Sequence, residues 1–380
     1  MQVNMNIPYN KPYLSGNELT YMKDALERGH ISGNGYYTKL CHGFFTERYD
    51  FFKCLLTSSC TDALEMAAIL LEIEPGDEVI MPAYTFVSTA NAFALRGAEI
   101  VFCDSRADYP GMDESLIEGL ITKRTKAIVP VHYAGVACDM EAIMRIAEKH
   151  GLYVVEDAAQ AVDSFFCDQP LGSIGHLGCF SFHETKNIIS GEGGMLVIND
   201  EKLQARAEVI WEKGTNRSAF FRGEIDKYGW VDIGSSFLPS DITAAFLYAQ
   251  LEQLDDIQAR RREHWQKYFD SLISISGKFA FALPYIPTYA TNNAHIFYIV
   301  TNSLDQRDKV IQLLSKHGIR AVFHYQSLNH SGYYLQNHPQ QSMPNSERYT
   351  DCLLRLPLYY ELPDDVPMLI AEYISQELGD

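Results

Sequence analysis

The chain has 380 residues, of which 47% are hydrophobic and 21% are charged, as in a globular protein with a sizeable core. The formal net charge of −18 argues against a nucleic-acid partner, because such binding depends on clustered lysine and arginine. No apolar run approaches the roughly 18 uncharged residues that span a bilayer, and the first residues lack a secretion signal. We therefore expect a cytoplasmic protein that binds neither nucleic acid nor a membrane.

Short apolar runs alternate with helical patterns in the first 160 residues. Strands are predicted to begin near Lys53, Glu78, Ala98, Lys126 and Leu152. Helices are predicted between them over residues 61–71, 88–95 and 140–150. This alternation is typical of parallel βαβ units whose strands are buried on both faces. The sequence therefore predicts an α/β fold with a mostly parallel sheet flanked by helices.

The pattern changes after Met195. A long polar, helical stretch is predicted over residues 241–272, followed by a connector rich in proline and aromatic residues, FALPYIP. Beyond it come a strand from His295, a helix over 305–317, the strand IRAVF and a terminal helix from Pro363. We predict a large domain of residues 1–250, which includes the N-terminal segment, and a smaller α+β domain of residues 251–380.

Ligands of open α/β sheets bind at the carboxyl ends of the strands, so the loops there are the first candidates for a site. In TSSCTDAL, a strand ends in small hydroxyl residues and a helix begins, at Ser59, Cys60 and Thr61. Backbone N–H groups at such a helix start can hold a phosphate. The alternative is that Ser59 or Thr61 is only a helix N-cap, which is the commoner explanation of this pattern.

Three more loops carry reactive side chains. The loop VVEDAAQAV offers Asp157 and Gln160, although one carboxylate at a strand end is often just another cap. An alternating strand, Cys179 to Phe182, delivers Ser181, His183 and Lys186 into a segment that continues as the glycine-rich SGEGG. Lys186 could instead be an exposed surface lysine and His183 a packed histidine. The fourth loop, PAYTFVSTA, places Phe86 at a strand end.

Together these groups match what pyridoxal 5′-phosphate (PLP) requires: a lysine for the imine, a carboxylate for the pyridinium nitrogen, and amides for the phosphate. A carboxylate keeps the ring nitrogen protonated, and only the protonated ring accepts the electron pair released when a proton leaves the substrate. Lys186 would act both as imine partner and as proton shuttle.

The sequence resembles the sugar-aminotransferase family often named after DegT, DnrJ, EryC and StrS, over nearly the whole chain. The shared segments include IPYNKPYLSGNE, GDEVIMPAYTFVSTANA, IVPVHYAGVACDM, VVEDAAQAV, SFHETKN and LRLPLYYEL. The likeness is greatest to dTDP-4-amino-4,6-dideoxygalactose transaminases, through EKGTNRS, RGEIDKY and DIGSS. The resemblance implies the aspartate-aminotransferase-like fold, PLP fold type I.

The resemblance also implies roles for single residues. Lys186 would form the imine with PLP, Asp157 would pair with the ring nitrogen, and Gln160 would bind the ring hydroxyl. Phe86 would stack on the ring. The phosphate contacts would come from Ser181 and the Cys60–Thr61 segment, although many relatives have glycine or alanine where this chain has Cys60.

The family pattern further implies a homodimer with active sites at the interface. Many relatives carry a G-x-N-x-R segment whose Asn reaches the phosphate of the neighbouring subunit. This chain reads GSSFLP, so Ser236 replaces the Asn and Leu238 replaces the Arg. A serine hydroxyl can still donate one hydrogen bond, so we expect Ser236 to make the contact across the interface.

The implied reaction transfers an amino group from L-glutamate to a nucleotide-linked keto sugar, converting dTDP-4-keto-6-deoxy-D-glucose to dTDP-4-amino-4,6-dideoxy-D-galactose. The substrate diphosphate would meet a basic cluster of Lys213, Arg217, Arg222 and Lys227. A solvated, charge-rich loop is the alternative for this cluster. His324 and Tyr325 match a family segment that approaches the substrate, but they could also be ordinary packing.

Several alternatives stay open. The enzyme could aminate another sugar carbon or give the other stereochemistry. It could be a dehydrase, although relatives of that kind abandon the Schiff-base lysine that Lys186 preserves. A metal site is suggested only by the proximity of Cys167, His176, Cys179 and His183, whose spacing fits no common zinc motif. Cys179 and His183 are expected on one face of the predicted strand, on the side of the site groups, and we expect no metal. A non-catalytic binding or regulatory protein would not need lysine, carboxylate and glutamine together.

Overall fold

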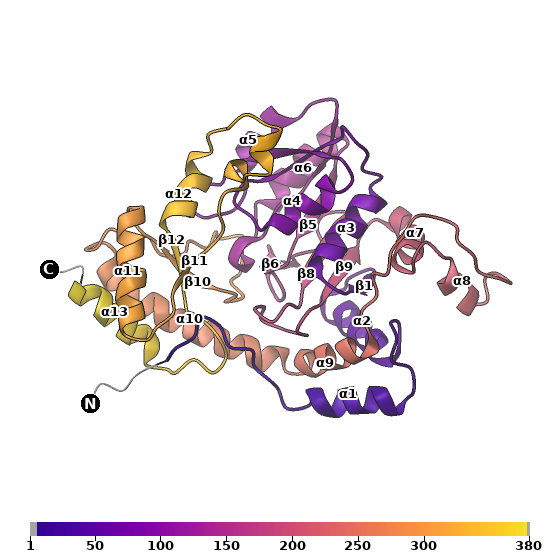
Figure 1. Ribbon diagram of the computed structural model, residues 1–380, viewed down its shortest axis with the longest axis horizontal. Coiled ribbons are helices and arrows are strands. Elements are labelled where there is room, and N and C mark those ends of the chain that lie inside the picture. Colours follow the sequence, from indigo (N-terminus) through magenta and orange to yellow (C-terminus); the bar gives the residue numbers. More distant parts are fainter. Residues whose placement is uncertain (1–5, 378–380) are drawn as a thin grey trace.

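A seven-stranded sheet forms the centre of the larger half of the molecule (Figure 1). The computed structural model describes residues 6–377. The strand order is β1 (Cys54–Thr57), β9 (Gly194–Ile198), β8 (Leu177–Ser181), β5 (Tyr153–Asp157), β4 (Thr125–Ile128), β2 (Glu78–Pro82) and β3 (Glu99–Cys103). Neighbouring strands from β8 to β3 are parallel, whereas β9 runs antiparallel to both β8 and β1. The predicted mostly parallel α/β sheet is confirmed.

Helices cover both faces of this sheet and bury one apolar cluster on each side. One face packs against α3 (Cys60–Leu70), α4 (Val87–Ala94) and α7 (Glu201–Trp211). The other packs against α2 (Tyr36–Tyr49), α5 (Glu114–Leu120), α6 (Met140–His150) and α9 (Asp241–Leu251), and α1 (Glu18–Glu27) lies outside α9 (Figure 1). Because both faces are covered, the strands read as continuous apolar runs in the sequence.

Polar caps explain why the predicted helix starts lie close to the observed ones. The side chains of Ser59, Asp139 and Ser240 each accept a hydrogen bond from a backbone N–H in the first turn of α3, α6 and α9. Helix α6 also ends as its sequence suggests, with Gly151 in the left-handed conformation. The observed bounds of α6 equal the predicted range, and α3 and α4 each differ by one residue at either end.

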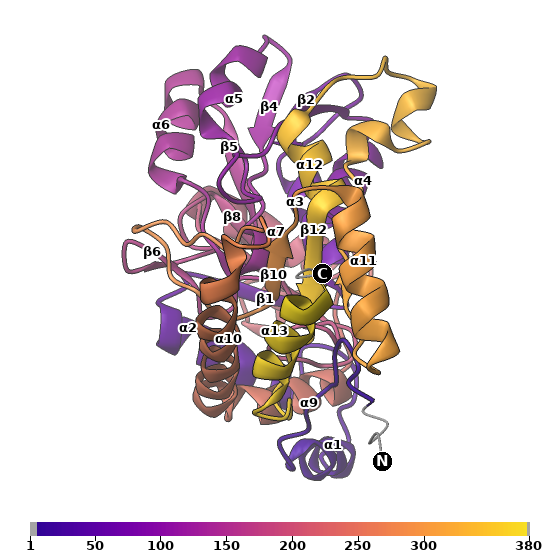
Figure 2. The same cartoon turned by 90° about the vertical axis from the view of Figure 1, so that its left-hand side faces the viewer.

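The smaller half contains a three-stranded antiparallel sheet, in the order β10 (Phe297–Val300), β12 (Leu353–Leu356) and β11 (Val322–Phe323). Helices α10 (Leu254–Ser276), α11 (Leu304–Lys316) and α13 (Val366–Glu377) lie on one side of it, and α12 (Pro344–Cys352) precedes β12 (Figure 2). The other side, through Tyr298 and Leu353, meets Tyr84 and Tyr133 of the large half. The small sheet therefore presents a face to the carboxyl edge of the large sheet.

Two segments connect the halves. Helix α10 begins in the core of the large half with Leu254 and Ile257 and continues into the core of the small half with Trp265 and Tyr268. The N-terminal segment also reaches the small half, where Ile7 forms a parallel bridge with Ile319. The proposed division between residues 250 and 251 falls at the end of α9 and remains a prediction.

Three expectations about the elements need correction. The helical stretch predicted as continuous over 241–272 is two helices, because the chain leaves helical geometry between Leu251 and Leu254. The strand predicted from IRAVF is only two residues long. Strand β9 was not predicted, since the glycine-rich SGEGG before it indicated a loop, whereas the chain turns back there to pair with β8. No helix in the described part of the chain is long and apolar enough to cross a membrane.

Candidate active site

The centre of the site is Asp157, the last residue of β5 at the carboxyl edge of the large sheet. Its Oδ2 accepts a hydrogen bond of 2.7 Å from Thr89 Oγ1 in the first turn of α4, and its Oδ1 accepts one of 3.1 Å from the Ala159 N–H. Burial raises the pKa of Asp157, and the hydrogen bonds and the charge of Lys186 partly counteract that effect. The carboxylate is thus fixed in position by Thr89 and the Ala159 N–H.

The strand that carries Asp157 is anchored on its other face by Glu156. This fully buried carboxylate accepts hydrogen bonds from the backbone N–H groups of Gly172, Ile174 and Gly175, and it lies 2.9 Å from Nε2 of the equally buried His132. A buried carboxylate is tolerated only when hydrogen bonds or an opposite charge replace the water that it loses. Because adjacent strand residues point to opposite faces, the network on Glu156 fixes the strand while Asp157 stays on the side of the site.

Lys186 lies in the connection between β8 and β9, and its N–H donates to the His183 carbonyl at 2.9 Å. The residue is half-buried. Desolvation is the main cause that lowers the pKa of Lys186, with a further contribution from the charge of Arg355, while Asp157 acts in the opposite direction. Lys186 is thus half-buried and is not the fully exposed surface lysine of the alternative.

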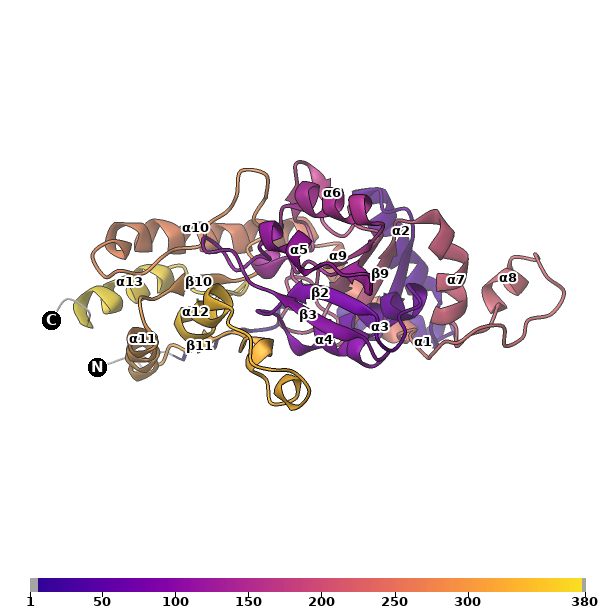
Figure 3. The ribbon, with the colours of Figure 1, turned by 90° about the horizontal axis from the view of Figure 1, so that it is seen from above.

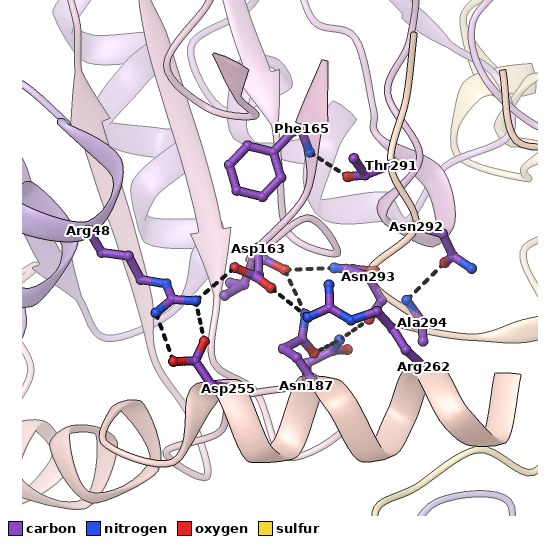
Figure 4. A network of polar contacts seen from close by, with 12 residues as sticks. Arg48, Asp163, Phe165, Asn187, Asp255, Arg262, Thr291, Asn292, Asn293 and Ala294 are labelled. Atoms are coloured by element: carbon purple, nitrogen blue, oxygen red, sulfur yellow. Dashed lines mark hydrogen bonds and ion pairs between the residues drawn. The ribbon is translucent and has the colours of Figure 1, made fainter. Parts of the chain in front are cut away.

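The polar groups behind Lys186 connect the lysine loop to α10. The Asn187 Nδ2 donates to Gln258 Oε1 at 2.7 Å and to the Asn293 carbonyl at 2.8 Å, and Asn293 Nδ2 donates to the Gln160 and Val162 carbonyls. Figure 4 shows this network beside the ion pairs that Asp163 makes with Arg48 and Arg262. The two loops that bear Lys186 and Gln160 are therefore held in one rigid frame.

The proposed phosphate cradle is the start of α3. Ser59 is the N-cap, since its Oγ accepts from the Asp62 N–H at 3.1 Å, so the capping interpretation of Ser59 is confirmed. The cap does not exclude a cradle, because the first N–H groups of a helix, here those of Cys60 and Thr61, have no intrahelical acceptor. The Thr61 hydroxyl donates to Ser88 Oγ at 2.8 Å, which joins α3 to the start of α4.

Gly194 closes the back of this cradle. A Cβ atom on Gly194 would lie 2.4 Å from the Cys60 nitrogen and 2.3 Å from the Ser59 carbonyl carbon, so only glycine fits. Across the β8–β9 pair, Gly194 is opposite Ser181, which is buried at the end of β8. The strand register thereby brings Ser181, predicted as a phosphate contact, to the same edge as Cys60 and Thr61.

The small half contributes His324 and Tyr325 to the site. The Tyr325 hydroxyl accepts from Gln160 Nε2 at 2.9 Å, and Gln160 Oε1 accepts from the Ala134 N–H at 2.6 Å. His324 is buried, its Nδ1 lies 2.6 Å from the Tyr133 hydroxyl, and burial holds its pKa well below the usual value. Gln160 retains one amide N–H for a ligand, as the predicted bond to a ring hydroxyl requires.

Phe86 and His183 differ in placement from the sequence expectation. Phe86 is not at a strand end but is the N-cap of α4, with 55% of its surface exposed and its ring centroid 6.0 Å from that of Tyr325. His183 lies beyond β8, which ends at Ser181, so it does not share a strand face with Cys179. Its Nδ1 is 2.9 Å from Thr185 Oγ1, in the turn that also contains Lys186.

Ser236 lies beside the cradle of its own chain. It is exposed, and the carbonyl of the next residue, Phe237, accepts from the Ser58 N–H at 2.9 Å. The expected contact from Ser236 to the site of a neighbouring subunit stays a prediction.

The basic cluster does not join the other site residues within one chain. Helix α8 (Arg217–Phe221) projects from the end of the molecule farthest from the small half (Figures 1 and 3). Lys213, Arg217, Arg222 and Lys227 are exposed there, and Arg222 is already paired with Glu208 and Glu224. Contact between these cations and a substrate would therefore need a neighbouring subunit.

Residues 12–374 match the DegT/DnrJ/EryC1/StrS aminotransferase family. The chain belongs to this family. It is similar to solved structures that cover nearly all of it, and three are informative. Spr1654 of Streptococcus pneumoniae, described as a sugar aminotransferase in its PLP form, has a TM-score of 0.90 and 27% identity, with 98% of this chain and 100% of that chain covered. The aminotransferase TlmJ from Streptoalloteichus hindustanus has a TM-score of 0.89 and 29% identity, with 98% of this chain and 99% of that chain covered. DesV from S. venezuelae, in complex with a ketimine intermediate, has a TM-score of 0.89 and 27% identity, with 99% of each chain covered.

Membership of the family confirms three expectations: the PLP fold type I, an enzyme with aminotransferase activity, and PLP as the cofactor. The residues present fit PLP, since a half-buried amine, a fixed carboxylate and the start of α3 converge at one sheet edge. The non-catalytic alternative is therefore wrong. Within residues 6–377 no group of three or more His, Cys, Asp or Glu side chains is placed to hold a metal ion.

Thr89, Tyr133 and Asn187 are not among the site residues predicted from the sequence. Thr89 and Tyr133 contact the predicted residues Asp157 and His324, and Asn187, which follows Lys186 in the chain, donates to Gln258. Thr89 lies in the segment FVSTANA that was quoted for the resemblance, so its position after a strand end was a usable signal. Tyr133 and Asn187 also lie in shared segments, IVPVHYAGVACDM and SFHETKN, but no local pattern shows which side chain each one contacts, because their partners are distant in sequence.

In this aminotransferase, Gly194→Ala should weaken PLP binding about ten-fold or more and lower the melting temperature, because the new methyl group would displace the Cys60 backbone. Fluorescence titration of the apo-protein with PLP and a thermal melt measure the two effects. Gly43→Ala in α2, where nothing lies within 4 Å of the new Cβ, is the control: it should keep the PLP affinity and should not lower the melting temperature, because alanine favours a helix more than glycine does. Unchanged PLP affinity in Gly194→Ala would contradict the cradle.

The lowered pKa of Lys186 also predicts the pH dependence of cofactor attachment. Only the neutral amine can attack the PLP aldehyde, so the rate should rise with pH and level off once Lys186 is deprotonated. Since desolvation lowers this pKa, the midpoint should lie below the roughly 10.4 of a free lysine. Stopped-flow absorbance of apo-protein mixed with PLP over a pH series gives the midpoint. A midpoint at or above the free value would contradict an enclosed Lys186.

Proposed function

We propose that the chain transfers the amino group of L-glutamate to a nucleotide-linked keto sugar. The proposed reaction converts dTDP-4-keto-6-deoxy-D-glucose to dTDP-4-amino-4,6-dideoxy-D-galactose. The observation that carries it is the convergence of Lys186, Asp157 and the start of α3 in a chain of this family. The choice of sugar rests on the shared segments EKGTNRS, RGEIDKY and DIGSS.

Bound PLP would supply an electron sink for the carbon that loses its proton. The chain's own residues do the rest. Lys186 Nζ takes the proton from the donor carbon and returns it on the other side of the imine bond, and its lowered pKa increases the share of the neutral, proton-accepting amine at any given pH. Asp157 holds the proton on the ring nitrogen, while Thr89 and the Ala159 N–H fix its two oxygens. We assign Phe86 to stacking on the ring and Gln160 and Ser181 to polar contacts with PLP.

We further propose a homodimer whose partner subunits complete each site. Large apolar side chains are exposed around α8, with Phe221 68%, Tyr228 51%, Trp230 84% and Val231 57% exposed. Several large apolar side chains exposed in one short segment are typical of protein–protein interfaces. The same segment bears the basic cluster, so pairing would bring Lys213 and Arg217 to the site of the partner, where they are suited to a substrate diphosphate.

The test is a two-step absorbance experiment with product analysis. L-glutamate should bleach the visible band of bound PLP, and the 4-keto-6-deoxy sugar nucleotide should restore it and yield an aminated sugar. Mass spectrometry detects the amine, and NMR decides the carbon and its configuration. A band that recovers with a 3-keto sugar instead would support amination at another position. A chain that never binds PLP would overturn the proposal.

A further inference from the structure

His295, which precedes β10 of the small half, is buried against the loop that carries Lys186. Its Nδ1 lies 2.8 Å from Oδ1 of Asn187, the residue that follows Lys186 in the chain. Asn187 is buried as well, so water does not compete for this contact. A side chain of the small half thus holds the immediate neighbour of the reacting lysine.

The backbone before His295 has an unusual conformation. Ala294 has a φ of 52°, in the left-handed region that residues other than glycine rarely adopt. The N–H groups of Ala294 and His295 donate at 2.8 and 3.0 Å to the side chain of the asparagine two residues earlier in the chain (Figure 4). Arg261 of α10 donates to the carbonyls of the same two residues. Such a conformation persists only where surrounding contacts hold it, and it is commonest at functional sites.

The contacts of Asn187 determine which nitrogen of His295 carries a proton. Asn187 Nδ2 lies 2.8 Å from the Asn293 carbonyl, which can only accept a hydrogen bond. The amide nitrogen must therefore face that carbonyl, and the amide oxygen, which also can only accept, must face His295. It follows that Nδ1 of His295 carries a hydrogen and donates it to Asn187.

The imidazole of His295 is neutral although cations lie around it. Burial holds its pKa well below the usual value, and the charges of Lys186, Arg261 and Arg355 act in the same direction. A protonated ring would add a positive charge near the Lys186 amine, whereas the neutral ring supplies an N–H donor without a charge. His295 can therefore hold Asn187 without repelling a charged form of the lysine.

We propose that His295 is a positioning residue for Lys186. Its Nδ1–H group fixes the Asn187 side chain, which also donates to Gln258 of α10, so the lysine loop is held from two sides. The Lys186 amine is thereby kept in place for the attachment of PLP. This inference rests on the role of Lys186 given in the proposed function, and it adds a residue of the small half that acts through Asn187.

The main experiment compares three replacements of His295 in the apo-protein. His295→Leu removes the donor and leaves Asn187 Oδ1 buried without a partner, so stopped-flow attachment of PLP should become about ten-fold slower. His295→Asn places an amide N–H near the position of Nδ1 and should restore the rate to within about two-fold. His295→Gln places its amide near the position of Nε2 and should not restore it.

Hydrogen exchange gives a readout that needs no cofactor. In apo-protein carrying His295→Leu, the peptide of residues 184–190 should exchange about ten-fold faster than in the wild type. His264→Leu is the matched control, because His264 is also buried and its Nε2 lies 3.3 Å from a backbone carbonyl, that of Tyr360. It should lower the melting temperature and leave both the exchange of this peptide and the rate of PLP attachment unchanged.

A double-mutant cycle tests whether His295 acts through Asn187. Asn187→Ala alone should reproduce the slower attachment and the faster exchange, which tests the pairing even if His295→Leu does not fold. Adding His295→Leu to Asn187→Ala should slow attachment by less than about two-fold more, because the contact is already lost. A full further loss would mean that His295 acts independently of Asn187 and would overturn the proposal.

The proposal is also overturned if His295→Leu attaches PLP and exchanges hydrogen as the wild type does, or if His264→Leu shows the same losses. Restoration by His295→Gln as complete as that by His295→Asn would contradict the role of Nδ1. Borohydride reduction separates this result from the proposed function. If the cofactor is attached to a lysine other than Lys186, the role of Lys186 fails, whereas hydrogen exchange still decides whether His295 holds the loop.

Discussion

Lys186→Ala should fold normally and lose essentially all aminotransferase activity, by about a thousand-fold or more. The reason is that the same Nζ of Lys186 is needed for the covalent bond to PLP and for the proton transfer, so that its removal abolishes both steps. Turnover with glutamate and the keto sugar measures the loss. Borohydride treatment followed by peptide mass spectrometry should find the cofactor attached to the wild-type Lys186 peptide and absent in the variant.

Lys316→Ala is the matched control, because Lys316 is exposed at the end of α11 and far from the site. It should keep both turnover and the labelled peptide. Circular dichroism and melting curves should be the same for both variants, which separates chemistry from folding. Substantial activity in Lys186→Ala would reject the assignment of this lysine.

Asp157→Asn should still bind PLP but slow proton removal from the donor by roughly 10²- to 10³-fold. The amide is nearly the same size, so it can stay beside Thr89, but it is neutral and no longer keeps a proton on the ring nitrogen. The loss should appear in the bleaching rate at saturating glutamate and not in glutamate affinity. A deuterium isotope effect from α-deuterated glutamate should increase as proton removal becomes slower.

Thr89→Val provides the graded comparison. It keeps the carboxylate of Asp157 and removes the 2.7 Å hydrogen bond, so it should slow the same step far less than Asp157→Asn. If Asp157→Asn reacts at near wild-type rates, Asp157 has no electrostatic role and the assignment is wrong. If Thr89→Val slows the step as strongly as Asp157→Asn, the position of the carboxylate matters as much as its charge.

The sequence was sufficient to predict those site residues whose position follows from local rules. Asp157 and Ser181 end buried strands, and Ser59 caps a helix, so their placement at one sheet edge follows from the parallel topology. The α/β class was equally predictable, because strands covered on both faces give apolar runs. Lys186 could be located because it follows a buried strand and precedes glycines, which allow neighbouring groups to approach closely, and because it lies in the shared segment SFHETKN.

Contacts between distant segments could not be predicted in the same way. Tyr133 and His324 meet at 2.6 Å although they belong to different halves, and nothing near either residue marks the pairing. Phe86 was predicted at a strand end in the loop PAYTFVSTA, whereas strand β2 already ends at Pro82 and Phe86 directly precedes α4. Strand β9 was not predicted because the glycine-rich segment before it indicates only that the chain turns. Such a turn can lead into a loop or into a strand that pairs with β8, and the glycines do not distinguish the two.

The pairing of β1 with β9 has a consequence for biosynthesis. Strand β1 lies at the edge of the sheet and is joined to it through β9, so the cradle after β1 is unsupported until residues 194–198 have left the ribosome. At about 5–20 residues per second, translation takes on the order of ten seconds to cover this interval. During that time the nascent chain carries an unpaired apolar edge. The cofactor cannot serve as an early folding template, and its capture must follow synthesis of nearly the whole large half.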